Sequence, residues 1–211
     1  MISGIKKVLV IAPHADDGEF SCGGSIKRFT EEGIEVYYTA FSPCNKSMPQ
    51  GYKENQLYDE LSKAVKHLGI NDDHIITYDF PVREFPKYRQ EILEELIKLK
   101  RKLAPDVVML PNSNDIHQDH HVIYEEGIRA FKHHKLLGYE LPWNNLCFEN
   151  SFHIKLKREH IERKLNAISE YKSQQFRPYV DEEFFFGLAK MRGIQINVEY
   201  AEAFELIRWF I

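Results

Sequence analysis

Two short stretches of the sequence are apolar at nearly every position, and they constrain the fold more than any other feature. Residues 7–12 read Lys-Val-Leu-Val-Ile-Ala, and residues 106–111 read Asp-Val-Val-Met-Leu-Pro. Their length and their β-branched residues are typical of strands buried on both faces. Because such strands usually belong to parallel sheets covered by helices, we expect an α/β protein.

Strand and helix patterns alternate between and around these two stretches. In the first half, further strands are predicted at 35–41 and 75–78, and helices between the loop 14–19 and Gly33, at about 54–68 and at 88–103. The second half is less regular, with helices predicted at 123–134, 158–171 and 181–191 and a strand at 145–148. The alternation predicts a Rossmann-like layered sheet, mostly parallel, with helices on both faces and a less regular C-terminal part.

Composition excludes several classes of protein. With 43% hydrophobic and 28% charged residues among 211, the chain can fill a core, and no repeat or linker divides it, so we expect one domain over residues 1–211. A formal net charge of -4 gives no general attraction to nucleic acids. No segment reaches the roughly 18 consecutive apolar residues that a membrane span needs.

The cysteines and the start of the chain bear on its location. The three cysteines lack CxxC spacing, which suggests neither a disulfide framework nor a cysteine-based zinc site. The apolar stretch near the start is too short for the core of a signal peptide. We therefore expect a cytoplasmic protein, and its oligomeric state stays open.

Two polar segments directly follow the two buried strands. The first contains His14, Asp16 and Asp17, and the second contains His117, Asp119 and His120. In open α/β sheets, ligands bind outside the carboxyl ends of the strands, so chemistry is expected at these two segments.

Taken singly, each of these side chains has an ordinary structural explanation, such as a helix cap or a solvated surface position. Together they form a set of imidazoles and carboxylates, which suits zinc or another divalent first-row ion such as Fe²⁺. Because the set contains no cysteine, a catalytic site with an open coordination position is favoured over a structural zinc.

The glycine pair Gly23-Gly24 has a different interpretation. A dinucleotide-binding turn would require the pattern G-x-G-x-x-G directly after the first strand, and that pattern is absent. Nearby carboxylates would also repel a pyrophosphate. We interpret the two glycines as allowing another helix to pack closely behind the loop.

Several motifs resemble those of one known family. Residues 13–19 resemble the A-H-P-D-D-E signature of the PIG-L/LmbE family of metal-dependent N-acetyl-sugar deacetylases, and residues 117–120 resemble its H-x-D-H motif. Residues 60–69 are similar to the family's E-x-x-x-A-x-x-x-L-G helix. Ser173-Gln174 and residues 201–204 resemble its S-Q and A-E-A-F tail, so the resemblance covers nearly the whole chain.

The resemblance implies a role for each residue of the two segments. His14, Asp17 and His120 would be the metal ligands, and Asp16 the general base that takes a proton from water. His117 would be an imidazolium that stabilises the oxyanion and helps to protonate the leaving amine. Asp119 would orient His117 and raise its pKa.

This sequence departs from the family pattern at some positions. Ala15 replaces the signature's proline, and Gly18 its first glutamate. The family often has a sugar-binding arginine three residues before the helix glutamate, where this chain has Leu57. Gln56 or Lys53 are candidates to replace it. The loop 42–52, together with residues after Leu137, is expected to shape the pocket.

The resulting functional hypothesis is a zinc-dependent hydrolase that acts on a linear amide bond. It would remove acetyl from an N-acetylglucosamine-type glycoside, nucleotide sugar or thiol precursor, giving acetate and a free amine; the substrate-binding residues stay unassigned. Two alternatives stay open: a metal-dependent amidase for a larger acyl group, and an inactive sugar-binding relative. The expected partner is therefore a small amino-sugar molecule.

Overall fold

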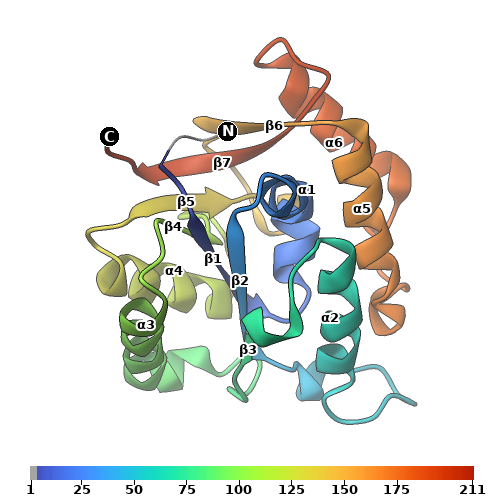
Figure 1. Ribbon diagram of the computed structural model, residues 1–211. Coiled ribbons are helices and arrows are strands. Elements are labelled where there is room, and N and C mark those ends of the chain that lie inside the picture. Colours follow the sequence, from blue (N-terminus) through green and yellow to red (C-terminus); the bar gives the residue numbers. More distant parts are fainter. Residues whose placement is uncertain (1–3) are drawn as a thin grey trace.

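The centre of the molecule is a seven-stranded sheet (Figure 1), seen in a computed structural model that describes residues 4–211. The strands are β1 (Lys7–His14), β2 (Glu35–Ser42), β3 (Ile75–Thr77), β4 (Val107–Pro111), β5 (Lys135–Tyr139), β6 (Phe152–Leu156) and β7 (Tyr200–Arg208). Their order across the sheet is β3-β2-β1-β4-β5-β7-β6. The first five in this order run parallel, whereas β7 is antiparallel to both β5 and β6. The prediction of a mostly parallel layered sheet is confirmed.

Helices cover both faces of the sheet (Figure 1). One face packs against α1 (Asp17–Glu31), α2 (Gln56–His67), α5 (Arg158–Ser169) and α6 (Glu182–Ile194). The other face packs against α3 (Arg89–Leu103) and α4 (Gln118–Ala130). Short 3-10 turns occur at Asn45–Ser47, Asp72–His74, Phe85–Tyr88, Pro142–Asn144 and Lys172–Gln174.

Strand β1 contributes side chains to the hydrophobic cores on both faces of the sheet. Its side chains point alternately to opposite faces, as the period of two in a strand requires. Val8 and Val10 lie in the core beneath α1, α2, α5 and α6, whereas Leu9 and Ile11 lie in the core beneath α3 and α4. All four are fully buried, which accounts for the unbroken apolar run in the sequence.

The strand order places a switch point at β1. This strand pairs with β2 on one side and with β4 on the other. The connection after β1 leads through α1 on one face, and the connection after β4 leads through α4 on the opposite face. The carboxyl ends of β1 and β4 therefore lie side by side where the two connections diverge, which is where α/β sheets bind ligands.

Two helices begin earlier than the sequence pattern predicts. Helix α1 starts at Asp17, within the segment 14–19 that was expected to be a loop, and α4 starts at Gln118 rather than at residue 123. The first turns of both helices are built from polar residues and glycine, which hide the apolar period on which the prediction depends. Asp17 and His120 thus lie on helices, not in loops.

The second half of the chain differs most from the prediction. Strands β5, β6 and β7 were not expected, and residues 145–148 do not form a strand. Leu146 in that segment is 88% exposed, so its apolar character does not reflect a core position. In β7, by contrast, Glu202 is buried, which breaks the alternation that normally marks a strand.

Among the helices of residues 4–211, none combines the length and the apolar character needed to cross a bilayer.

Candidate active site

The switch point gathers side chains from both polar segments. His14 is the last residue of β1, Asp17 opens α1, and His120 lies in the first turn of α4. All three are buried, with His14 and Asp17 each 8% exposed and His120 1%. The topology alone therefore brings together residues that lie about a hundred positions apart in the sequence.

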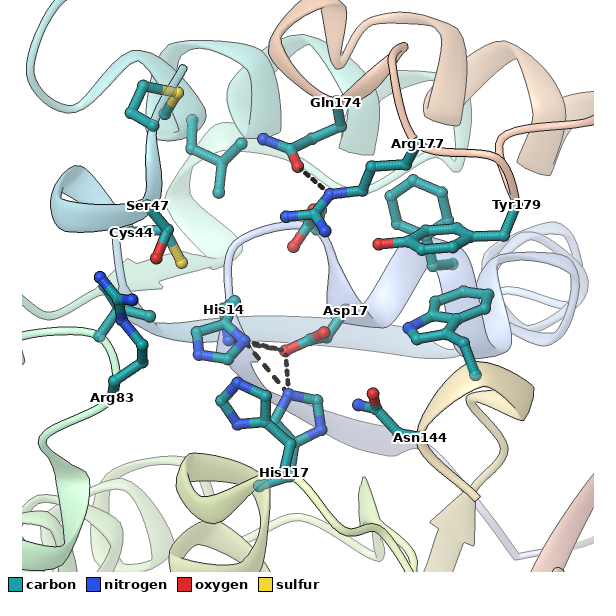
Figure 2. A pocket seen from close by; sticks show the side chains of 17 residues that line it. His14, Asp17, Cys44, Ser47, Arg83, His117, Asn144, Gln174, Arg177 and Tyr179 are labelled. Atoms are coloured by element: carbon teal, nitrogen blue, oxygen red, sulfur yellow. Dashed lines mark hydrogen bonds and ion pairs between the residues drawn. The ribbon is translucent and has the colours of Figure 1, made fainter. Parts of the chain in front are cut away.

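Three atoms of these residues form a nearly equilateral triangle (Figure 2). His14 Nδ1 and His120 Nε2 lie 3.1 Å apart, and each is 3.2 Å from Asp17 Oδ2. Ligand atoms at 2.0–2.1 Å around a tetrahedral zinc would lie roughly 3.3 Å apart. Two imidazole nitrogens and one carboxylate oxygen are also the donors of a catalytic zinc site, so the residues fit a divalent ion.

The remaining nitrogen of each imidazole is held by a second carboxylate. His14 Nε2 lies 3.1 Å from Asp119 Oδ2, and His120 Nδ1 lies 2.8 Å from Asp115 Oδ2. Such outer carboxylates fix the ring orientation of metal-binding histidines and increase their basicity. Asp115 was not singled out from the sequence, although it lies within the polar segment after β4.

These carboxylates also set the charge of the two imidazoles in the metal-free chain. Burial opposes the charge of His14, but Asp17 and Asp119 outweigh it and raise its pKa from 6.5 to about 9. Burial likewise opposes the charge of His120, whereas Asp17 and Asp115 raise its pKa to about 10. Burial also acts against the charge of Asp17, yet His120 and His14 hold the pKa of Asp17 well below its usual range.

Asp16 lies beside this cluster and has a different environment. It is half-buried, lines the cleft described below, and occupies the N-cap position of α1 without a side-chain capping bond. Burial and the neighbouring Asp17 charge raise its pKa from 3.8 to about 6, although His14 and Arg177 act in the opposite direction. A carboxylate with such a pKa is suited to accept a proton near neutral pH.

His117 lies on the other side of the cluster, at the N-cap of α4. Its Nδ1 accepts a hydrogen bond from the backbone N–H of Asp119 at 3.2 Å. Burial and the charges of His120 and His14 lower its pKa from 6.5 to about 4. A neutral His117 with Nδ1 as acceptor carries its proton on Nε2.

Three imidazoles therefore meet at the site. His14, His117 and His120 each offer one nitrogen, and these atoms lie within 4.8 Å of one another. The triangle of His14, His120 and Asp17 is tighter, with sides of 3.1 to 3.2 Å.

Asp119 was predicted to orient His117 and to raise its pKa, and the structure shows other partners for its carboxylate. The carboxylate of Asp119 contacts His14 and accepts hydrogen bonds from the backbone N–H groups of Arg83 and Phe85, at 2.6 and 3.2 Å. The hydrogen bond between Asp119 and His117 uses the backbone N–H of Asp119. The Asp119 charge acts to raise the pKa of His117, as predicted, but burial and the charges of His120 and His14 outweigh it and lower that pKa to about 4. The first turn of α4 faces the end of β1, which directs the Asp119 side chain to His14.

The cluster forms the floor of a cleft of about 200 Å³. Figure 2 shows the labelled side chains of Cys44, Ser47 and Arg83 on one side of His14 and those of Arg177 and Tyr179 on the other. The loop 42–52 lines the cleft, together with residues after Leu137, as the sequence predicts. Trp143 stacks on Tyr179 with ring centroids 3.8 Å apart and forms an aromatic wall.

Neither candidate for the missing arginine lines the cleft. Lys53 pairs with Asp59 on the surface, and the Gln56 amide donates to Glu60. The cleft instead contains Arg177 and Arg83. Sequence reasoning missed Arg177 because it lies in an irregular segment far from both ligand motifs.

Gly18, where the family signature has glutamate, has a packing explanation. A Cβ atom at this position would lie 2.4 Å from the ring of Tyr38, and the Tyr38 hydroxyl accepts a hydrogen bond from the Gly18 N–H at 3.0 Å. The same hydroxyl bonds to Glu19 at 2.6 Å. Burial raises the pKa of Glu19 to about 8.

The sequence is similar to those of known deacetylases. Diacetylchitobiose deacetylase of Thermococcus kodakarensis is 31% identical over 134 residues, which make up 60% of this chain and 49% of that protein. The matched region thus spans about half the length of that relative. An uncharacterized deacetylase of Escherichia coli, YaiS, is 29% identical over 174 residues, 80% of this chain and 91% of that protein.

A solved structure shares the fold over nearly the whole chain. N,N'-diacetylchitobiose deacetylase from Pyrococcus horikoshii superimposes with a TM-score of 0.79 and 24% identity, covering 96% of this chain and 84% of that one. The model of the PIG-L family, described as GlcNAc-PI de-N-acetylase, matches residues 9–131. Because this match covers more than half of the chain and includes both clusters of polar residues, the protein belongs to the PIG-L family.

Proposed function

We propose that this chain is a hydrolase that uses a divalent metal, zinc or another first-row ion such as Fe²⁺, to remove acetyl from an N-acetylated amino sugar. The observation that carries the proposal is the triangle of His14 Nδ1, His120 Nε2 and Asp17 Oδ2, with sides of 3.1 to 3.2 Å. A divalent ion held there would polarise the acetamide carbonyl and lower the pKa of a water molecule to about 7.

Asp16 is proposed as the general base. It accepts a proton from the attacking water, whose oxygen bonds to the acetamide carbonyl carbon. It then passes this proton to the nitrogen as the C–N bond breaks, which releases acetate and a free amine. The raised pKa of about 6 supports both transfers, because the group is then neither too weak a base nor too weak an acid at neutral pH.

His117 is proposed to stabilise the negative charge that develops on the carbonyl oxygen. With Nδ1 occupied by the Asp119 N–H, its Nε2–H is free to donate. Because the pKa of His117 is lowered to about 4, it would act as a neutral hydrogen-bond donor rather than as an imidazolium. Asp119 and Asp115 would keep His14 and His120 oriented for metal binding.

The walls of the cleft support an amino sugar as the substrate. Aromatic surface from Trp143, Tyr179 and Phe20 would contact the apolar edge of a sugar ring, and Arg177, Gln174 and Asn144 would bind its hydroxyl groups. The Arg177 Nε–H donates to Gln174 Oε1 at 2.6 Å, which leaves its other N–H groups to face the cleft. The substrate is proposed to be an N-acetylglucosamine-type unit with a substituent.

The test is a release assay for acetate and primary amine across a panel of N-acetylated sugars. The native chain, loaded with zinc, iron or cobalt, is expected to release both products in equal amounts, and chelation should stop the reaction until metal is restored. The panel includes sugars with longer acyl groups, because turnover of these alone would point to a different amidase. Metal binding without release from any member would indicate an inactive sugar-binding relative, and full activity in chelator would exclude the metal mechanism.

A further inference from the structure

Helix α1 is interrupted one turn after the residues that face the metal cluster. Cys22 has φ −128° and ψ 24°, outside the helical region. In an unbroken helix, the N–H of Ser25 would bond to the carbonyl of Ser21. Here the Ser21 carbonyl accepts from Lys164 Nζ at 3.0 Å, and the Ser25 N–H donates to Glu202 Oε2 at 2.7 Å.

The two side chains that enter the helix form an ion pair with each other. Lys164 of α5 and Glu202 of β7 are 4% and 8% exposed, and Lys164 Nζ lies 2.8 Å from Glu202 Oε1. Glu202 Oε1 also accepts from the Gly24 N–H at 3.1 Å. One buried pair therefore bonds both ends of the break, and side chains inserted into the helix ladder are a recognised cause of kinks.

The two glycines of the sequence motif make this insertion possible. A Cβ at Gly23 would lie 2.9 Å from Lys164 Cγ, and a Cβ at Gly24 would lie 3.1 Å from Glu202 Oε1 and 2.6 Å from Leu156. The interpretation that the glycines allow close packing of a helix is supported for α5, and the reason is specific. Gly23 makes room for Lys164 of the charged pair, and Gly24 makes room for both Leu156 and Glu202.

The break separates a short segment, Asp17–Ser21, from the rest of α1. Its N-terminal end carries Asp17 and follows Asp16, and its C-terminal carbonyl is held by Lys164. We propose that Lys164 and Glu202 are positioning residues: by holding the break in α1 open, they direct Asp16 and Asp17 toward the metal-binding cluster. This inference rests on the metal site of the proposed function.

The first test replaces the pair without leaving one buried charge unpaired, since an unpaired charge would by itself unfold the site. The double variant Lys164→Met/Glu202→Leu removes the hydrogen bonds at the break, whereas Lys164→Gln/Glu202→Gln retains donors and acceptors without charge. The matched control is Arg192→Met/Glu140→Leu, because this pair is also largely buried, with Arg192 Nε 3.0 Å from Glu140 Oε2, but it joins α6 to the residue that follows β5.

The readout is the Co²⁺ dissociation constant, measured by competition with a coloured chelator, together with the visible spectrum of the Co²⁺ form. The Met/Leu variant is expected to bind Co²⁺ about 10- to 100-fold more weakly, as altered support of a metal ligand does, with a changed spectrum. The Gln/Gln variant should recover most of the affinity, and the Arg192/Glu140 control should match the native chain. Equal affinities in all variants would mean that the pair serves stability alone, which would overturn the proposal.

A second test does not depend on folding of the Met/Leu variant. Gly23→Ala would press on Lys164, whereas Gly187→Ala adds the same methyl group to a helix position with no atom within 4 Å. Gly23→Ala is expected to weaken Co²⁺ binding, and Gly187→Ala to leave it unchanged. If both match the native chain, the positioning role is wrong. If the native chain itself does not bind Co²⁺, the proposed function fails instead, so the two failures are distinguishable.

Discussion

The two strand-to-helix junctions of the site use their N-cap residues in different ways. At β4–α4, His117 accepts the N–H of Asp119 through its side chain and so caps the helix. At β1–α1, Asp16 makes no capping bond, although aspartate is among the strongest capping residues. The Gly18 N–H is bonded by the Tyr38 hydroxyl instead. The His117 side chain is thus held through Nδ1, whereas the Asp16 carboxylate is not tied to its helix by a capping bond.

The largest expected effect comes from removing that free carboxylate. Asp16→Asn keeps the shape of the side chain but cannot accept a proton, so kcat should fall by about 10²–10⁴. Metal content should stay near that of the native chain, because Asp16 lies outside the ligand triangle. Steady-state kinetics with metal analysis by mass spectrometry would check both. The control is Asp17→Asn, which should lose metal as well; loss of metal in Asp16→Asn would contradict the assignment.

The role of His117 at the β4–α4 junction can be tested with substitutions that separate helix capping from catalysis. His117→Asn retains a strong N-cap residue, so the thermal midpoint should change little. Loss of the Nε2–H donor should lower kcat by about 10²–10³. His117→Ala should show the same loss of rate and an additional destabilisation of about 1 kcal/mol from the missing cap. Native rates in His117→Asn would leave His117 with a structural role only.

A smaller effect is expected from the two carboxylates behind the imidazoles. Asp115→Asn and Asp119→Asn should each weaken metal binding by about 10- to 100-fold. Asp119 accepts two backbone N–H groups, those of Arg83 and Phe85, whereas Asp115 accepts one, that of His117, so Asp119→Asn should lower the free energy of unfolding by about 1–3 kcal/mol more than Asp115→Asn. Chelator competition and urea denaturation of the metal-free variants would distinguish them. Equal stability of the two variants would argue that the second backbone contact of Asp119 contributes little.

The sequence predicted the parallel half of the fold better than the rest, and the reason is physical. Strands β1 and β4 are buried on both faces, so nearly every side chain is apolar and the pattern is unambiguous. Strand β7 instead directs Glu202 into the interior, where Lys164 pairs with it. A buried ion pair has no signature in hydrophobic periodicity, so such a strand is not recognisable from one sequence.

The candidate site also contains residues that the sequence predicts and residues that it does not. The two polar segments were predictable because they directly follow the buried strands, and the resemblance to the PIG-L/LmbE family selected His14, Asp17 and His120 within them. Arg177 and Asp115 were not, because their roles depend on distances that only packing fixes. Two motifs that the sequence shows only as separate matches contact each other in the structure. Glu60 of the helix motif accepts hydrogen bonds from both the N–H and the hydroxyl of Ser173 in the S-Q motif, at 3.1 and 2.6 Å.

The smallest expected effect is the pH dependence of stability and of metal affinity, to which His14 of the β1–α1 junction and His120 of the β4–α4 junction contribute separately. In the metal-free chain, the pKa values of His14 and His120 are raised from 6.5 to about 9 and 10. Their contribution to stability is thus complete below about pH 6.5 and is lost as pH rises through 9 to 10. Metal binding requires both rings neutral, so its affinity should change in the opposite direction, rising about tenfold per pH unit for each proton released.

Calorimetry in buffers of different ionisation enthalpy would count these protons. Asp119→Asn removes a carboxylate from His14 alone, and Asp115→Asn removes one from His120 alone. Each variant should therefore release fewer protons near pH 8, because the pKa of the ring that loses its second carboxylate falls, although Asp17 still raises it. If neither substitution changes the number of protons released, the carboxylates do not hold the imidazoles charged, and the two junctions titrate as one unit.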